Sequence, residues 1–252
     1  MRFAKWELFK PFISFSQGFS VIDIGRYVRS AKENDVARMQ IEPVTVNNYE
    51  AGFSSNLGWL QFTGSYFIST NKIGASLVED NTGWFTQQKA PEKTYGYELS
   101  VDVQPTTNTG FGASYAFVEG KADINKNGDF NDDEDTYLNG LKIAPPKASA
   151  YIKYEPIKSI SLYLQWLHFG DRERFQPRAN GSYGNGDGPV KGAGIVNFSG
   201  AWSVNKKLQV KLGFENLLNN FYYSPMAQWS GRDDNYTPAN GARFQLGLAL
   251  KW

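Results

Sequence analysis

The sequence predicts an all-β fold, an antiparallel transmembrane β-barrel, from three observations. Apolar and polar residues alternate along about ten segments of about ten residues, the length of a tilted strand that crosses a bilayer. The links between these segments alternate between short and long, as in a barrel with short turns on one side of the membrane and long loops on the other. Aromatic residues make up 15% of the 252 residues, and Trp and Tyr recur near the predicted strand ends, as in an interfacial girdle.

The alternation is clearest in the segments 60–68, 95–104, 160–166, 208–215 and 243–252. In the last of them, every second position from 244 to 252 is Phe, Leu, Leu, Leu and Trp, whereas small or polar residues stand between. One face of each predicted strand is therefore apolar and the other polar or small.

The links follow the order long, short, long along the chain. Short links are predicted at 54–58, 105–109, 155–158 and 204–207, and long links at 21–44, 71–92, 120–146, 171–191 and 216–240. By analogy with outer-membrane barrels, the long links are expected outside the cell.

A soluble β-sandwich is the alternative fold, because its strands also alternate. The solvent face of a sandwich should carry many Lys and Glu residues, whereas the second face here is rich in Gly, Ser, Gln and Thr. This composition suits a polar lumen and favours the membrane barrel. A soluble sugar-binding sandwich remains a third, more remote alternative.

The composition excludes several classes of function. The net charge is +1 and the basic residues are dispersed, so no nucleic-acid partner is predicted. The chain has no Cys and a single His, which excludes disulfides, Cys-ligated zinc and multi-His metal centres. No apolar run reaches 18 residues, so no membrane-spanning helix is expected, and the first residues lack the apolar segment of a signal peptide.

Five motifs, in order, resemble the C-terminal half of the barrel of TonB-dependent outer-membrane receptors, in particular those for ferric siderophores. They are Phe-Ser-Gln-Gly-Phe at 15–19; Ile-Glu-Pro at 41–43 with Asn-Tyr-Glu-Ala-Gly-Phe at 48–53; Ala-Pro-Glu-Lys-Thr-Tyr-Gly-Tyr-Glu at 90–98; Phe-Glu-Asn-Leu-Leu-Asn-Asn at 214–220 followed by Tyr222 and Tyr223; and the terminal strand 241–252. The resemblance implies that residues 1–252 form a single domain, about the last ten strands of a 22-stranded barrel. The plug domain and the N-terminal TonB box would lie outside this chain.

The resemblance also implies a function. The intact protein would import a ferric siderophore or a similar metal chelate across a Gram-negative outer membrane, energised by the TonB complex, with no catalysis and no required cofactor. Outer-membrane lipid would surround the barrel, and the closing aromatic, Trp252, would be the signal for the barrel assembly machinery. The alternative is that ten strands close on themselves as a self-contained protease or adhesin, since an arc of a wider barrel leaves two unpaired edges.

A bulky and often anionic chelate calls for aromatic faces and hydrogen-bond donors near the outer mouth. The candidate ligand contacts in the long links are Trp84, Phe85, Tyr137, Arg172, Arg174, Tyr222, Tyr223, Trp229, Arg232 and Tyr236. For each aromatic among them, the alternative is an anchor in the interfacial girdle.

Residues 123–134 match the twelve-residue template of a calcium loop. Oxygen-bearing residues occupy positions 1, 3 and 5, Gly128 position 6, an apolar residue position 8 and a Glu position 12. The template assigns the metal ligands Asp123, Asn125, Asn127, Asp129, Asn131 and Glu134. Bound calcium would be structural, and the alternative is an acidic surface loop without a metal.

A catalytic interpretation has to begin from His168, near the outer end of a predicted strand. Asp171 and Glu173 follow it, so the three could activate water at a barrel mouth. The alternative is an interfacial residue of the aromatic girdle, and no enzymatic function is predicted.

Overall fold

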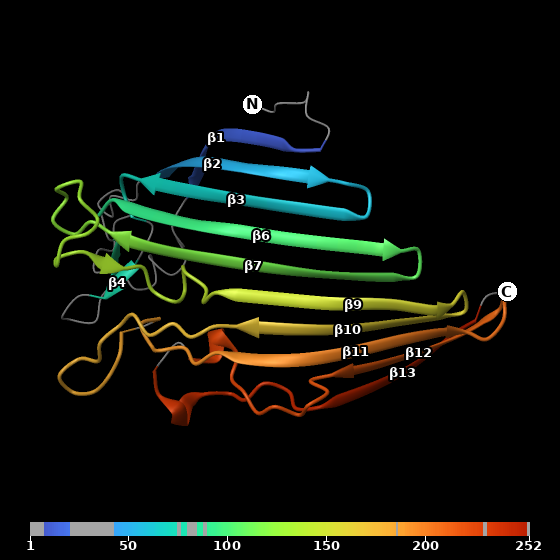
Figure 1. Ribbon diagram of the computed structural model, residues 1–252. Coiled ribbons are helices and arrows are strands. Elements are labelled where there is room, and N and C mark those ends of the chain that lie inside the picture. The colour runs from blue at the N-terminus through green and yellow to red at the C-terminus, as the bar shows by residue number, and fades with distance from the viewer. Residues whose placement is uncertain are drawn as a thin grey trace.

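The computed structural model of the chain describes residues 8–20, 43–74, 77–79, 85–87, 90–184, 186–228 and 231–250. These residues build one antiparallel sheet of 11 strands, shown in Figure 1. Ten strands neighbour one another in chain order: β1 (Lys10–Ser20), β2 (Val44–Asn56), β3 (Leu60–Asn71), β6 (Glu92–Thr106), β7 (Thr109–Ala122), β9 (Lys147–Ile157), β10 (Ile160–Phe169), β11 (Ala193–Ser203), β12 (Leu208–Glu215) and β13 (Arg243–Leu250). The predicted number and order of strands are confirmed.

The remaining elements are short and lie in the long links. β8 (Thr136–Tyr137) extends the sheet beside β7, and β4 (Leu77–Glu79) pairs with β5 (Phe85–Gln87) in a separate ribbon. Two 3₁₀ turns, η2 (Pro225–Gln228) and η3 (Asp233–Asn235), follow β12. None of the helices in the described part of the chain is long and apolar enough to span a bilayer.

Short and long links alternate as predicted, and Figure 1 shows the long ones together at one end of the sheet. Asn side chains close two of the short links. Asn56 Oδ1 accepts the Gly58 amide at 2.9 Å, and Gly58 has φ +84, a conformation that favours glycine. Asn205 Oδ1 accepts the amides of Lys207 and Leu208. These Asx turns allow adjacent strands to reverse within a few residues.

The apolar positions of successive strands fall on one face of the sheet. The strand register brings one row together across six strands: Phe111, Ile152, Leu164, Phe198, Phe214 and Phe244. Phe111, Ile152 and Phe244 are 43%, 52% and 55% exposed. A continuous band of exposed apolar side chains is stable against lipid rather than water.

Polar side chains pair with one another on the opposite face. Thr63 and Ser100 share a hydrogen bond of 2.7 Å, and Ser114 and Ser149 share another of 2.7 Å. Farther along, Asn197 Nδ2 donates to Gln165 Oε1 at 3.3 Å. This face has the composition expected for a barrel lumen.

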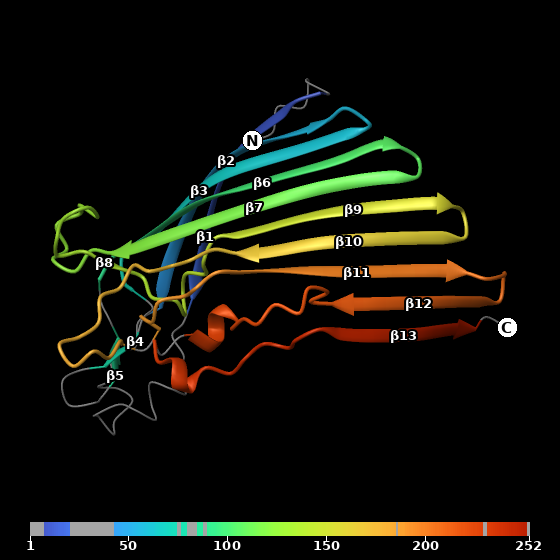
Figure 2. The same cartoon turned by 60° about the horizontal axis from the view of Figure 1, so that its bottom comes forward.

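The sheet is a curved, open arc (Figures 1 and 2). In the described part of the chain, β1 pairs only with β2 and β13 only with β12, so both edges are open. The structure is therefore a partial barrel, and the alternative in which ten strands close on themselves is not the arrangement seen.

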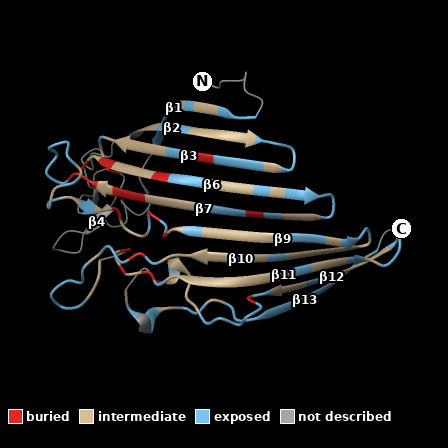
Figure 3. Cartoon of the chain, in the orientation of Figure 1, coloured by how far each residue is buried: buried red, intermediate tan, exposed pale blue. Residues whose placement is uncertain are grey.

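The small apolar core lies at the long-loop end rather than between layers. Ala90, Ala122, Leu138 and Ile143 form a buried cluster, and Val118 packs against it. Figure 3 shows buried residues concentrated where β6 and β7 meet the long loops. These loops are consequently held by side-chain packing and do not depend on the sheet ladder alone.

Candidate ligand-binding end of the sheet

A pocket of about 290 Å³ lies where the links after β10 and β12 meet. It is lined by Pro189, Lys191, Gly192, Ala193, Phe221, Tyr222, Tyr223, Gln228 and Tyr236. Three of the predicted ligand contacts, Tyr222, Tyr223 and Tyr236, are thus brought together. Their rings, with one cation and one amide, can contact an apolar or anionic ligand.

Aromatic contacts and one buried amide hold this pocket in shape. The Tyr223 and Tyr236 rings meet edge to face at 5.2 Å, and Tyr222 packs against Phe169 of β10 at 6.1 Å. Gln228 is 3% exposed, and its side chain bonds both the amide (3.0 Å) and the carbonyl (3.1 Å) of Lys191. Gln228 therefore ties one long link to the other.

Asn216 explains why the chain turns toward the pocket after β12. Its φ is +48, which Asn tolerates better than most residues, and it is 3% exposed. Asn216 Nδ2 donates to the carbonyls of Asn220 (2.8 Å) and Asn240 (3.3 Å), and Oδ1 accepts the Asn220 amide (2.9 Å). This Asn of the Asn-Leu-Leu-Asn motif thus joins the two ends of the last long link.

A buried ion-pair cluster gathers three other predicted contacts. Glu119 of β7 is 2% exposed and accepts hydrogen bonds from Arg172 Nη2 (2.9 Å) and Arg174 Nε (3.2 Å). Arg172 Nη2 also donates to the carbonyl of Leu138 (2.7 Å). The Arg174 guanidinium lies 5.3 Å from the centre of the Tyr137 ring. Two arginines thus share the carboxylate of Glu119.

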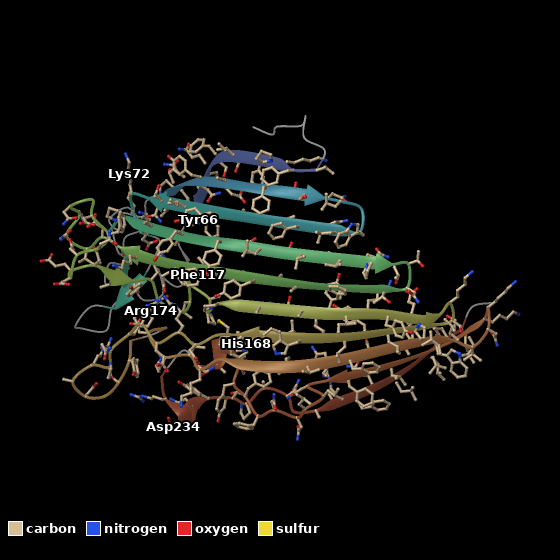
Figure 4. All side chains as sticks on the ribbon, viewed as in Figure 1. Tyr66, Lys72, Phe117, His168, Arg174 and Asp234 are labelled. Atoms are coloured by element: carbon tan, nitrogen blue, oxygen red, sulfur yellow. The ribbon has the colours of Figure 1, made fainter. Side chains whose placement is uncertain are left out.

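Within this cluster, the two arginines differ in exposure. Arg172 is 6% exposed, and its Nε is buried without a hydrogen-bond partner. The Arg174 side chain is 46% exposed and lies at the long-loop end of the sheet, as Figure 4 shows. Arg174 is therefore the arginine of this pair that is open to a ligand.

Four predicted contacts remain, of which only Arg232 has a described side chain. Arg232 is exposed, at the start of the turn that contains η3. The backbone of Phe85 belongs to β5, but its side chain, Trp84 and Trp229 lie outside the described residues, as does Trp252.

The 123–134 loop is folded by its own carboxylates and amides. Asp123 is 0% exposed, and its two oxygens accept the amides of Asn127 (3.2 Å) and Gly128 (2.9 Å). Gly128 has φ +85, as the turn at template position 6 requires. Asn125 and Asn127 side chains donate to Asp132 Oδ2 at 2.9 and 2.7 Å. These two bonds lower the pKa of Asp132.

The structure differs from the template at the end of this loop. The side chain of Glu134 is exposed. Both carboxylate oxygens of the next residue, Asp135, are buried without a hydrogen-bond partner. Burial, and then the charge of Asp132, raise the pKa of Asp135. No three His, Cys, Asp or Glu side chains in the described residues already form a metal-binding group.

His168 lies on the apolar face of the sheet. Its ring stacks on Trp166 with the centres 5.4 Å apart and the planes at 7°. Asp171 is engaged elsewhere, since its Oδ1 accepts the Gly192 amide at 2.7 Å. Figure 4 shows His168 near the loop end of β10, the position of an interfacial ring.

Two pocket residues, Lys191 and Gln228, were not singled out by the sequence. Neither belongs to an alternating segment or to a motif, so no local signal marked them. A further pocket of about 660 Å³ lies along the middle strands, with Glu98, Lys147 and Gln165 in its lining. Its polar lining follows from the alternation, but its position on the curved sheet does not.

The long strands form an open arc with one polar face, an apolar band on the other face and long loops at one end. These features define a section of a large outer-membrane β-barrel. The family model described as "TonB dependent receptor-like, beta-barrel" matches residues 3–217, and the chain belongs to this family. The resemblance inferred from the five motifs is thus confirmed.

Solved structures share the fold at low sequence identity. The copper transporter OprC matches with a TM-score of 0.75 and 19% identity over 96% of this chain and 37% of its own. The ferric-catecholate import receptor Fiu from E. coli K12 matches with a TM-score of 0.70 and 18% identity over 99% and 34%. The pyoverdine receptor FpvA from Pseudomonas aeruginosa PAO1 gives 0.72 and 14% over 100% and 35%. This chain spans about a third of the length of each.

Proposed function

We propose that the chain forms the C-terminal part of the barrel wall of an outer-membrane receptor that imports a ferric siderophore or a similar metal chelate, energised through TonB. The observation that carries this proposal is the aromatic pocket of Tyr222, Tyr223 and Tyr236 at the long-loop end. Family membership supports transport rather than catalysis. The names of the neighbours, a copper transporter, a ferric-catecholate import receptor and a pyoverdine receptor, support a metal or metal chelate as cargo.

In this proposal, the pocket tyrosines and Lys191 contact the chelate, and Gln228 positions the backbone of Lys191. Arg174 and Tyr137 form a second contact group, because an exposed guanidinium over an aromatic ring suits an anionic, partly aromatic ligand. Trp84, Phe85, Trp229 and Arg232 are further proposed contacts. Arg172 holds the Leu138 carbonyl directly and is linked to Arg174 through the carboxylate of Glu119. The plug and TonB box belong to the complete polypeptide.

The test is uptake of radiolabelled ferric chelates by cells that carry the complete receptor, compared with cells that lack it or lack TonB. Uptake of one chelate class that needs both proteins supports the proposal. Tyr222→Ala should weaken binding of that chelate about 10-fold or more, because an aromatic contact in the pocket is removed. Met226→Ala is the control, since Met226 is 66% exposed on the same link and outside the pocket lining.

The self-contained barrel makes a different prediction. If ten strands closed on themselves, the native polypeptide in isolated outer membranes would have a mass near 28.3 kDa. The proposed receptor should be roughly three times larger, because this chain spans 34–37% of the neighbours above. A small native polypeptide, or uptake without TonB, would overturn the proposal.

A further inference from the structure

The loop between β7 and β8 contains a buried carboxylate that has no partner. Asp135 is half-buried as a residue, but both of its carboxylate oxygens are shielded from solvent, and neither accepts a hydrogen bond of normal geometry. Burying an ionised carboxylate is costly unless it is paired with a donor or a cation. Buried polar groups without a partner are rare in folded proteins, so this one requires an explanation.

The groups around Asp135 increase its need for a cation. The negative charges of Asp132 and Asp123 act on it, and both belong to the same loop. Lys121 is the positive charge that acts on it, but the Lys121 ammonium lies over the Tyr137 ring, 5.2 Å from the ring centre. Like charges in one loop repel unless a cation lies between them.

The same loop presents further oxygens. Asn125 Oδ1 accepts the Asn127 amide at 3.1 Å, and Asn127 Oδ1 accepts the Asp129 amide at 2.7 Å. An amide oxygen has two lone pairs, so each can keep this bond and also bind a metal. Carboxylate, amide and main-chain oxygens in a loop that bends at glycine are the ligands calcium takes, six to eight at a time.

We propose that this loop binds one Ca²⁺ through Asp123, Asn125, Asn127, Asp132 and Asp135, with the main-chain carbonyl of Asp129. This set departs from the sequence template at one end. Asp135 replaces Glu134, whose side chain is exposed and whose amide instead donates to Asp132 Oδ1 at 3.0 Å. Asn131 is not a direct ligand, because its side chain bonds Asp129 Oδ1 at 3.2 Å.

Calcium acts by ordering the loop. In the described residues, no three His, Cys, Asp or Glu side chains form a group that could hold a metal ion, so this proposal requires Asp123, Asp132 and Asp135 to move closer together when calcium binds. Asp135 directly precedes β8, which carries Tyr137 and leads to Leu138, the carbonyl partner of Arg172. An ordered loop therefore fixes the end of β8 beside Glu119 and its two arginines.

The test is equilibrium binding of ⁴⁵Ca²⁺ to the native, detergent-solubilised protein, with hydrogen exchange of residues 123–138 as a second readout. We expect one saturable site with a dissociation constant of about 10⁻⁴ to 10⁻³ M, typical of extracellular calcium modules, and slower exchange in the loop when calcium is bound. Asp135→Asn should weaken binding at least about 10-fold and abolish the slower exchange.

Asp133→Asn is the matched control, because it removes the same charge from an exposed residue of the same loop. It should change the affinity less than about 2-fold, as expected for a screened surface charge. Equal weakening by both substitutions would mean unspecific charge attraction and would overturn the proposal. Absence of saturable binding by the unsubstituted protein up to about 10 mM would overturn it too. Neither result depends on transport, so the calcium-site proposal and the receptor proposal can be refuted independently of each other.

Discussion

The strand region and the long-loop end of the sheet are stabilised by different interactions. Along the strands, backbone ladders satisfy the polar groups, and one face exposes apolar side chains such as Leu164 at 40%. At the long-loop end, stability comes from buried side chains, among them Glu119 and Asn216 at 2% and 3% exposed. The strand region depends on its surroundings, a bilayer, whereas the loop end carries its own small core. Substitutions should therefore destabilise the two regions for different physical reasons.

The largest effect is expected at the buried ion pair. Glu119→Ala leaves the buried Arg172 without its carboxylate, which should cost about 3–5 kcal/mol of local stability. Hydrogen exchange of the links 136–146 and 171–191 in the detergent-solubilised protein measures this opening. The control is Glu215→Ala, because the Glu215–Arg243 pair has side chains 47% and 51% exposed, and such pairs contribute about 0–1 kcal/mol. Similar losses at the two sites would remove the distinction between the regions.

The next effect tests which face meets the lipid. Leu164 and Gln165 are adjacent in β10 and point to opposite faces, Leu164 into the apolar row and Gln165 toward Asn197. Leu164→Arg should cost about 2–4 kcal/mol, the value for Arg on the lipid face near the midplane. Gln165→Arg should be tolerated in a polar lumen. Urea titration of the protein folded into vesicles compares them, and a larger loss for Gln165→Arg would reverse the assignment of faces.

These two predictions also separate what the sequence reveals from what it does not. The opposite faces of Leu164 and Gln165 follow from a period of two, which is local information, and so do the short links around Gly58 and Asn205. The pairing of Glu119, near the end of β7, with Arg172, in the link after β10, joins residues 53 positions apart. No alternation or motif encodes such a contact, because it depends on how an irregular link packs against the end of a distant strand.

The proposed calcium-binding loop lies between these cases. Its template was readable because oxygen ligands must recur at fixed spacing around one ion. The proposed use of Asp135 in place of Glu134 as a metal ligand could not be predicted from the sequence. It depends on which of the two adjacent carboxylates is buried.

A smaller loss of stability is expected at Asn216, whose side-chain amide joins the two ends of the last long link. Asn216→Asp replaces the Nδ2 donor by an oxygen facing the carbonyls of Asn220 and Asn240, which should cost about 1–3 kcal/mol. Asn205→Asp, at the opposite end of β12, is the control, because Asn205 only accepts hydrogen bonds and a carboxylate accepts them equally well. Protease cleavage of the 216–242 link in folded protein measures the difference. Faster cleavage in both variants alike would assign the loss to the added charge.

The smallest effect concerns a partly buried carboxylate in the link between β10 and β11. Burial raises the pKa of Asp187, although Arg178 and Arg172 act to lower it. Its folded-state pKa therefore exceeds the unfolded value of about 3.9, so its stabilising contribution is complete below that pH and is lost as the pH rises through the folded pKa.

Asp187→Asn, which stays neutral, should increase protection of the 182–190 backbone at pH 7 by less than about 1 kcal/mol and leave it unchanged near pH 3. Asp234→Asn, an exposed site in η3 marked in Figure 4, should change neither value. Weaker protection at pH 7 in Asp187→Asn would mean that the pairing with the two arginines outweighs the cost of burial.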